Sequence, residues 1–413
     1  MLPAESRPSN SISLDEALAL IQSVARPVSE SEIVSLESAL GRCLAGPAIA
    51  GRALPPFDNT AVDGYAFRRA DAPATGPARL TLHGESAAGV PFAGIVPPGA
   101  AIRISTGAVL PDGADAVAMQ EDCMVEDRRV VIDPTPPQGA NIRRAGNDIG
   151  RGDVAFPAGH RLRAQDIALL RALGFVTVGV RRRLRVAIAP TGAELREAGA
   201  TLEAGQIVET NGLMLAQLLA GFPVDVTLLD PLPDDRAATE AALVAAAADH
   251  DLIVTTGGVS VGDHDHVRPA LIAKGKVHFW RISIRPGKPV LFGEVGSALM
   301  LGLPGNPVSA IVTFFMIAVP IVRALLGARA TELPGFGVKL ASSLRKEPHL
   351  REFPRARLEW EDGEPRATLY RDQSSNLISS LAWADGLLDL PAGPSELSAG
   401  ETVIYRPFAA LLG

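Results

Sequence analysis

Apolar side chains recur at helical spacing near the start of the chain and at strand spacing further on. Ser13 and Glu16 have the spacing of a helix capping box, and apolar residues follow at intervals of three and four as far as Val24. Over residues 55–138 the apolar stretches are short and lie between Pro and Gly residues, which is typical of strands joined by turns. The pattern therefore predicts an amphipathic first helix and then a small β-rich domain over 55–138.

A second helical pattern follows the β-rich segment. It covers residues 139–183 and is clearest from Gln165 to Leu173. We expect this segment to pack against the first helix. Residues 1–54 and 139–183 are therefore predicted to form a helical linker domain.

Strand and helix patterns alternate regularly between residues 184 and 330. Such alternation predicts a doubly wound, mostly parallel sheet, which binds ligands beyond the carboxyl ends of its strands. The predicted strands are 185–189, 224–229, 251–255, 277–284, 290–292 and 299–303, and the predicted helices are 211–220, 235–248, 267–273 and 308–326.

The last of these helices, residues 308–326, is long and apolar enough to span a membrane. Pro320 and Arg323 interrupt it, and it directly follows a predicted strand and a tight turn. We therefore predict a buried core helix.

Strand patterns return after the apolar helix. The pair Asp362-Gly363 lies between two alternating stretches, 356–360 and 367–370, and is typical of a tight hairpin turn. Residues 331–413 are therefore predicted to form a C-terminal β domain.

Composition and charge exclude several classes of protein. The 413 residues are 47% hydrophobic and 21% charged, the balance of a globular chain long enough for two or three domains. A formal charge of −7 and an aromatic content of 5% do not suit binding to nucleic acid or to an anionic membrane. Cys43 and Cys123 are too few for a disulfide framework, and residues 1–11 lack the features of a secretory signal. We expect a cytoplasmic protein that holds any anion in a local cationic pocket.

One glycine-rich turn follows the predicted strand 251–255. Its glycines, including Gly257 and Gly258, would let backbone N–H groups approach an anion, although the spacing fits neither the dinucleotide motif nor the P-loop. Residues 258–262 also match the G-x-S-x-G elbow of serine hydrolases, with Ser260 as the nucleophile, so a hydrolase stays open as an interpretation. In the adjoining Asp-His-Asp-His run, Asp265 is a candidate magnesium ligand, because Mg²⁺ commonly uses one or two carboxylates together with substrate phosphates.

Two further turns carry groups suited to an anion. Arg285 and Lys288 lie three positions apart around a Pro-Gly turn, which would hold two cations in fixed positions. Residues 303–309 place a sharp turn before the apolar helix, with Pro307 suited to the first helical position and the helix N-terminus favourable for an anion. Taken singly, each turn could equally be a solvated loop or a simple helix start.

Four segments in order resemble the molybdopterin molybdenumtransferase family, the MoeA type that includes the E domain of gephyrin. They are 56–66 (PFDNTAVDGYA), 257–262 (GGVSVG), 285–289 (RPGKP) and 302–309 (GLPGNPVS), and the resemblance covers essentially the whole chain. It implies a MogA-like α/β domain over 184–330 that binds molybdopterin, and a C-terminal β-barrel-like domain.

The resemblance also implies an activity in molybdenum cofactor biosynthesis. Family members insert molybdate, their substrate, into the dithiolene of adenylylated molybdopterin, with Mg²⁺-dependent hydrolysis that releases AMP. The carboxylates that match the family's acidic, catalytic positions are Asp63, Asp148, Glu194, Asp234 and Asp265, of which Asp234 and Asp265 are the candidate Mg²⁺ ligands. The positions expected to bind molybdopterin-AMP and molybdate are Thr106, Arg143, Gly257, Gly258, Ser260, Arg285, Lys288, Pro304, Pro307, Ser309, Arg355 and Ser375.

The family's assembly is implied in the same way. It is an elongated homodimer with a cleft shared between subunits, to which Thr106 and Arg143 would reach from the β-rich domain of the second chain. Implied partners are the molybdopterin adenylyltransferase and the molybdoenzymes that accept the product.

Two positions depart from the family pattern. Arg285 stands where the family usually has lysine, and a planar guanidinium does not reproduce the geometry of an ammonium. Ala193 stands where the family often has aspartate, although Glu194 follows it. A second hypothesis is therefore a non-catalytic protein of the same fold that binds molybdopterin or serves as a scaffold.

Overall fold

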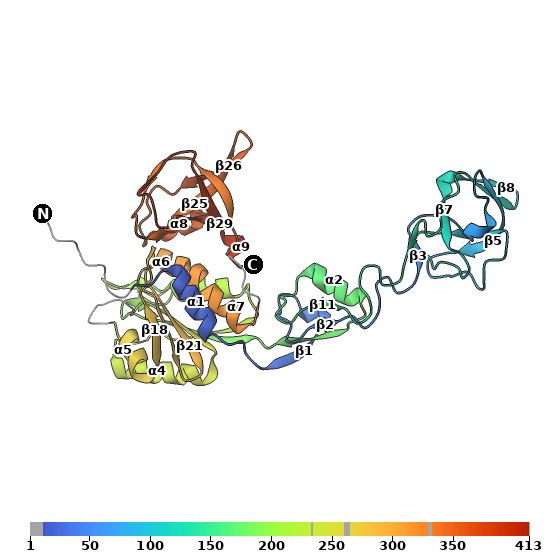
Figure 1. The fold of residues 1–413 in the computed structure, drawn as a ribbon. Helices are drawn as coiled ribbons and strands as arrows, with labels where there is room; N and C mark the ends of the chain where they lie inside the picture. Colours follow the sequence, from blue (N-terminus) through green and yellow to red (C-terminus); the bar gives the residue numbers. More distant parts are fainter. Residues whose placement is uncertain (1–10, 233, 260–264, 329–332, 413) are drawn as a thin grey trace.

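The computed structural model describes residues 11–232, 234–259, 265–328 and 333–412. It is an elongated molecule in which an α/β body carries a C-terminal barrel, and a long arm extends from the body (Figure 1). We call residues 31–181 the arm. The arm is continuous with the body through a single pair of antiparallel strands, β1 (Ser31–Ser35) and β12 (Thr177–Arg181).

The body is built on a six-stranded mixed sheet. Its first four strands are parallel, as predicted, and β20 is antiparallel to both of its neighbours. The exception arises because β20 and β21 are joined by a two-residue turn, which allows only a hairpin. The strand order is β16 (Val224–Leu228), β13 (Leu184–Pro190), β17 (Leu252–Thr256), β21 (Ala298–Leu303), β20 (Leu291–Val295) and β18 (Lys276–Trp280).

Helices cover both faces of this sheet, which confirms the doubly wound α/β class (Figure 1). The larger apolar cluster packs four helices on one face, and a smaller cluster packs two on the other. The first group is α1 (Leu14–Val24), α3 (Asn211–Leu219), α6 (Pro307–Thr313) and α7 (Val319–Leu325), and the second is α4 (Arg236–Asp249) and α5 (Val267–Lys274).

The long apolar segment is a core helix, as predicted. Pro307–Leu325 passes the length and hydropathy test for a membrane span, but 83% of its most apolar window is buried inside the protein. A π-helical turn, Phe314–Ala318, separates α6 from α7. It lies just before Pro320, which lacks the N–H that a continuous α-helix would need there.

The arm corrects the expected helical linker. Between residues 139 and 183 only α2 (Ala164–Ala172) is α-helical, and the other elements are β10 (Ile142–Arg143), β11 (Val154–Phe156) and β12. Along β12, buried Val178 and Val180 alternate with exposed neighbours, so the apolar period there is two. The first helix does not pack against α2: α1 lies on α7 in the body, whereas α2 belongs to a separate core in the arm.

A six-stranded sheet forms the far end of the arm. Its core lies between buried Phe67, Leu80 and Ile132. The order is β7 (Ala116–Met119), β4 (Gly64–Phe67), β6 (Ala100–Ile104), β5 (Ala78–Ser86), β9 (Arg129–Ile132) and β8 (Cys123–Glu126), while the short pairs β3 (Asn59–Thr60) with β10 and β2 (Ala48–Ile49) with β11 lie along the arm.

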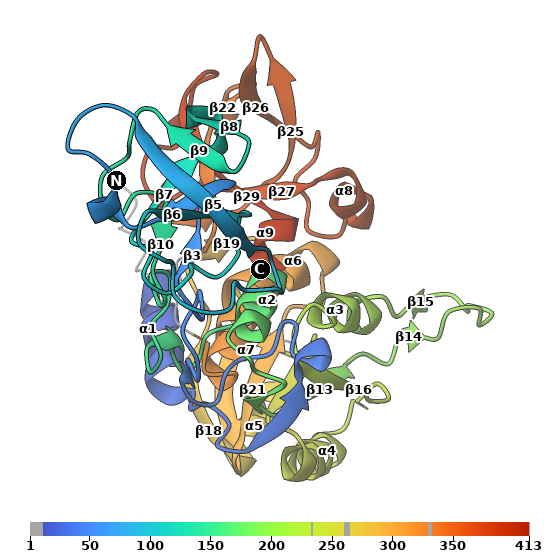
Figure 2. The same cartoon turned by 90° about the vertical axis from the view of Figure 1, so that its right-hand side faces the viewer.

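The C-terminal part is a closed five-stranded barrel. It is drawn in red in the upper part of Figure 2. The predicted hairpin is present, and Asp362 (φ 52°) and Gly363 (φ 79°) both adopt the left-handed conformation of a tight two-residue turn. The barrel order is β22 (Phe336–Leu340), β26 (Glu364–Leu369), β25 (Arg355–Glu361), β27 (Gly386–Asp389) and β29 (Thr402–Pro407), with α8 (Ile378–Trp383) and α9 (Phe408–Leu412) as its helices.

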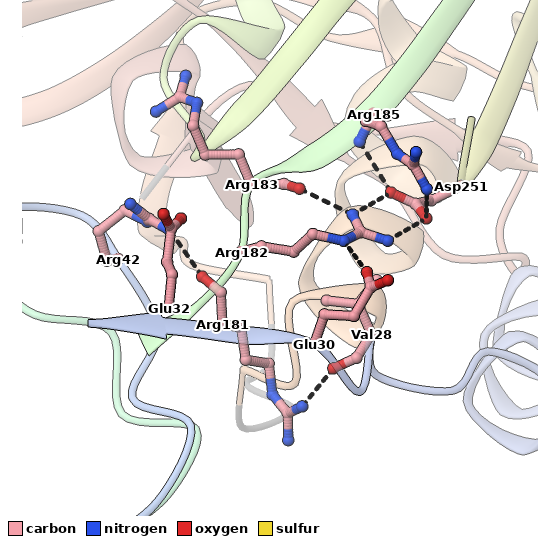
Figure 3. A network of polar contacts seen from close by, with 9 residues as sticks. All are labelled: Val28, Glu30, Glu32, Arg42, Arg181, Arg182, Arg183, Arg185 and Asp251. Carbon is pink, nitrogen blue, oxygen red and sulfur yellow. Dashed lines mark hydrogen bonds and ion pairs between the residues drawn. The ribbon is translucent and has the colours of Figure 1, made fainter. Parts of the chain in front are cut away.

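A network of ion pairs fastens the arm to the body (Figure 3). Arg182 follows β12 directly, donates two hydrogen bonds to the Asp251 carboxylate at 2.6 and 2.8 Å, and pairs with Glu30. The backbone N–H of Arg185 donates to the same carboxylate at 2.8 Å. Burial opposes ionisation of Asp251, but these hydrogen bonds keep its pKa below the usual value. Arg182, which follows the arm directly, is thus bound to Asp251 at the amino end of β17 and to Glu30, which directly precedes the arm.

Candidate active site

A cavity of about 590 Å³ opens at the carboxyl edge of the body sheet. The parallel strands β13, β17 and β21 end there, at Pro190, Thr256 and Leu303. The segments that follow all three strands line the cavity, together with the start of α3 and residue Asn376 near α8. This is the edge at which sheets of this class bind ligands.

The glycine-rich turn after β17 forms one wall of the cavity. Gly257 (φ 88°) and Gly258 (φ 65°) adopt left-handed conformations, and a Cβ on Gly257 would lie 2.5 Å from Thr191 Oγ1. The backbone N–H of Gly257 donates to the Leu303 carbonyl at 2.9 Å, which joins this turn to the one after β21. Glycine is required here because a side chain would disturb both the turn and its contact with Thr191.

Ser260 lies outside the described residues. Asp265 and His266 lie outside any helix, and α5 begins only at Val267. A nucleophile elbow needs a helix that continues directly from the serine. Residues 260–264, where such a helix would begin, lie outside the described ranges, so the serine hydrolase interpretation stays a prediction from the sequence.

The turn after β21 forms a second wall. Pro304 is buried, and Pro307 is the first residue of α6, as predicted. The Asn306 side chain donates to Ser375 Oγ at 3.0 Å, and the Val308 N–H donates to the Ser375 carbonyl at 3.1 Å. Ser309, in the first turn of α6, is 5% exposed. Three of the positions expected to bind substrate thus lie together, at the turn Pro304–Ser309, beside Ser375.

The Arg-Pro-Gly-Lys turn packs on the same helix. A Cβ on Gly287 would meet Thr313 Cγ2 at 2.4 Å and the Ser309 carbonyl at 3.6 Å, so the turn lies close against α6. Arg285 Nη1 is 3.7 Å from Glu352 and 4.0 Å from Glu347, and the guanidinium is largely exposed. Lys288 is exposed and makes no ion pair with any residue that the structure describes. The turn that carries the two predicted cations therefore packs along α6, and Arg285 lies beside two carboxylates.

Arg355 is fully buried at the start of β25. Its guanidinium donates to the carbonyls of Asp372, Gln373 and Ser374 at 2.9, 3.1 and 3.1 Å. Burial lowers the pKa of Arg355 to about 10. In this structure the arginine holds the segment that leads to Ser375, and so fixes that serine beside the turn after β21.

Two of the five predicted carboxylates, Glu194 and Asp265, line the cavity. Asp234 is exposed, in the segment between β16 and α4, and is not part of the lining. Within the described ranges no group of three acidic, His or Cys side chains forms a complete metal site. The donor set still fits Mg²⁺, which commonly binds one or two protein carboxylates together with phosphate oxygens of the substrate.

The remaining predicted residues lie on the arm, away from the cavity of the same chain (Figure 1). Asp63 accepts hydrogen bonds from the backbone N–H and the hydroxyl of Thr106 at 2.6 and 2.8 Å, which lower its pKa. Arg143 pairs with Asn59 in the β3–β10 ladder, and the Asp148 N–H donates to Leu54. Of these four arm residues, Asp63 and Thr106 are hydrogen-bonded to each other.

Among the cavity-lining residues that sequence reasoning missed are two polar side chains near the start of α3, Glu209 and Asn211. Asn211 is 8% exposed, and its side chain donates to the Gly305 carbonyl at 2.7 Å. Glu209 accepts from the Gly212 N–H at 2.7 Å. Their position was the available signal, because polar residues at a helix start after a parallel strand lie at the ligand-binding edge.

Comparison with known families places these features in one group. Three family models match the chain in order: the MoeA N-terminal region (domain I and II) over residues 12–174, the probable molybdopterin binding domain over 187–324, and the MoeA C-terminal region (domain IV) over 337–408. Together they cover the arm, the body and the barrel.

Whole-chain relatives agree. The molybdopterin molybdenumtransferase of Haemophilus influenzae is 38% identical over 387 residues, covering 93% of this chain and 95% of that protein. Gephyrin of Dictyostelium discoideum is 30% identical over 449 residues, covering 95% of this chain and 62% of gephyrin. The crystal structure of the molybdopterin biosynthesis MoeA protein from Pyrococcus horikoshii OT3 is 30% identical, with a TM-score of 0.82 and coverage of 96% and 99%. Fold and site thus define a transferase of molybdenum cofactor biosynthesis. The chain belongs to the MoeA family of molybdopterin molybdenumtransferases.

Proposed function

We propose that this protein inserts molybdate into the dithiolene of adenylylated molybdopterin and hydrolyses the adenylyl phosphoanhydride, with release of AMP. The observation that carries the proposal is the meeting of three turns at one sheet edge. The Gly257 turn bonds to the end of β21, and the turn of Arg285 and Lys288 packs on α6, which starts directly after β21. A phosphate-bearing ligand and a tetrahedral oxyanion would therefore be held side by side.

The oxyanion half is assigned to the start of α6. Lys288 supplies an ammonium without a protein counter-ion among the described residues, Arg285 supplies a guanidinium, and Ser309 and Ser375 supply hydroxyl donors. Arg355 would act by fixing the segment before Ser375. Fixed donors and cations of this kind bind a doubly charged tetrahedral anion without reorganisation.

The phosphoanhydride half is assigned to the glycine-rich turn and the carboxylates. Backbone N–H groups of the turn would face phosphate oxygens, and Glu194 and Asp265 would orient the attacking water. Mg²⁺ held by Asp265, with Asp234 as the second expected ligand, would neutralise charge on the phosphate. Pro304 and Pro307 would shape the wall between the two halves.

The arm residues complete the proposal in a homodimer. Asp63, Thr106, Arg143 and Asp148 lie on an arm that extends away from its own body, so they would serve the cavity of a second chain (Figure 1). We infer a cytoplasmic dimer that receives its substrate from an adenylyltransferase and passes its product to molybdoenzymes.

The test is AMP release from adenylylated molybdopterin with Mg²⁺ present, as molybdate is titrated and sulfate and tungstate serve as comparisons. Saturable, molybdate-dependent release is expected. A folded protein that binds the pterin but releases no AMP with any oxyanion would contradict the proposal and favour the scaffold hypothesis.

A further inference from the structure

Trp280 contacts the glycine-rich turn from β18, which is an edge strand of the body sheet. It is the last residue of β18, and its indole N–H donates to the Val259 carbonyl at 2.8 Å. In the sheet order two strands, β21 and β20, lie between β17 and β18. Because β18 runs in the same direction as β17, its last residue lies at the carboxyl edge, where the cavity opens.

Two arginines fix the indole in place. The guanidinium carbons of Arg268 and Arg281 lie 3.8 and 4.0 Å from the centroid of the Trp280 ring. Both cations therefore lie within cation–π distance of the same indole ring. Neither arginine makes an ion pair with a carboxylate that the structure describes, so each cation is stacked on the indole without a protein counter-ion among the described residues.

The turn itself is tethered at only two points in the described part of the chain. The Gly257 N–H donates to Leu303 at one end, and the Val259 carbonyl accepts from Trp280 at the other. Val259 is 2% exposed and lines the cavity, and it packs closely enough on β21 that a Cβ on Gly302 would be 2.5 Å from its side chain. The N–H groups of Gly258 and Val259 have no acceptor among the described residues.

We propose that Trp280 is a positioning residue that holds the Gly257–Val259 turn with its unbonded N–H groups directed at the phosphate-bearing part of the substrate. The indole N–H fixes the Val259 carbonyl, and the arginine pair keeps the ring from turning. This inference rests on the proposed function, because the phosphate ligand is the one assigned there.

The first test is the variant Trp280→Phe, which keeps an aromatic ring beside the two arginines and removes the N–H donor. Losing one hydrogen bond predicts a rise in KM for adenylylated molybdopterin of up to about tenfold, with kcat and the molybdate dependence nearly unchanged. Trp360→Phe, at a ring that is 70% exposed in the barrel hairpin, is the matched control and should leave KM unchanged. An unchanged KM in Trp280→Phe, with an active wild-type protein, would overturn the inference.

A second measurement does not depend on the folding or activity of that variant. The chain has three tryptophans, so Trp360→Phe/Trp383→Phe leaves Trp280 as the sole emitter. AMP titrated into this protein should shift the emission with saturation if Trp280 senses the phosphate-binding turn. Unshifted emission while AMP binding is measured calorimetrically would contradict the role of Trp280. Inactive wild-type protein would instead contradict the proposed function.

Discussion

Arg285 keeps the positive charge of the lysine that is usual at this position in the family, but presents a planar guanidinium in place of an ammonium group. Its guanidinium lies between the carboxylates of Glu347 and Glu352 at 4.0 and 3.7 Å and points to the barrel side of the turn. Part of its charge is therefore balanced by protein groups, while Lys288 has no such partner among the described residues. Both cations are carried by the same turn, which packs against α6 through Gly287.

Replacing Arg285 by alanine is expected to raise the molybdate concentration for half-maximal AMP release about tenfold or more, because a charge-assisted contact to the oxyanion is lost. The dependence on adenylylated molybdopterin should not change. Arg345→Ala removes an exposed arginine on β23 (Leu344–Arg345) and is the control. Equal molybdate dependence in both variants would remove Arg285 from the oxyanion site.

Sequence reasoning reached the residues that lie within recognisable turns and missed those that act across the sheet. Gly257, Gly258 and Pro307 could be predicted because backbone conformation or helix start favours their residue type, whereas Pro304 was implied only by the family resemblance. The hydrogen bond from Trp280 to Val259 joins residues 21 positions apart through an indole N–H. From the sequence alone, a tryptophan at the end of a strand is predicted only to be a core residue. Asn211 was missed for a similar reason, since a polar residue at a helix start is usually a cap.

At the scale of elements, strong periodicity with a capping signal predicted the bounds well. The Ser13 hydroxyl accepts from the Glu16 N–H at 3.1 Å, and Glu16 accepts from the Ser13 N–H at 2.7 Å, which fixes the start of α1. The prediction of a helical linker was wrong because strands of two or three residues, such as β2 and β11, have too few positions to show a period of two in the sequence. Their pairing is decided by tertiary contacts.

Ser13→Ala should lower the free energy needed to open the first turn of α1 by about 1 kcal/mol. That change corresponds to roughly fivefold faster amide hydrogen exchange at that turn. Ser23→Ala is the matched control at the other end of the helix, where the hydroxyl only donates back to Leu20. Faster exchange in both variants alike, or in neither, would show that packing of α1 on α7 alone sets its stability.

For the whole molecule, the connection between arm and body decides whether the arm residues can reach a second cavity. That connection is a two-stranded ribbon held by Arg182, Glu30 and Asp251 (Figure 3). Because the pKa of Asp251 is lowered in the folded protein, its stabilising effect is complete above the ordinary value of 3.8 and is lost as pH falls through the folded value.

Limited proteolysis of the ribbon should therefore accelerate as the pH is lowered below about 4 in the wild-type protein. Asp251→Asn should be cleaved faster already at neutral pH, because it weakens the paired hydrogen bonds to Arg182, and should lose the acid dependence of this step. Asp225→Asn removes an exposed partner of Arg183 and is the control. Cleavage of Asp251→Asn at the wild-type rate would show that the network does not hold the arm.

The central claim is that molybdate insertion takes place in a cavity of one chain completed by the arm of another, and mixing two inactive variants tests it most directly. Asp63→Asn alters the arm and Asp265→Asn alters the cavity, and each homodimer should release almost no AMP. After both are unfolded and refolded together in equal amounts, half of the dimers are mixed, and each mixed dimer has one intact site of two. We predict recovery of about one quarter of the wild-type rate. No recovery, from mixed dimers shown to have formed, would contradict a site shared between chains.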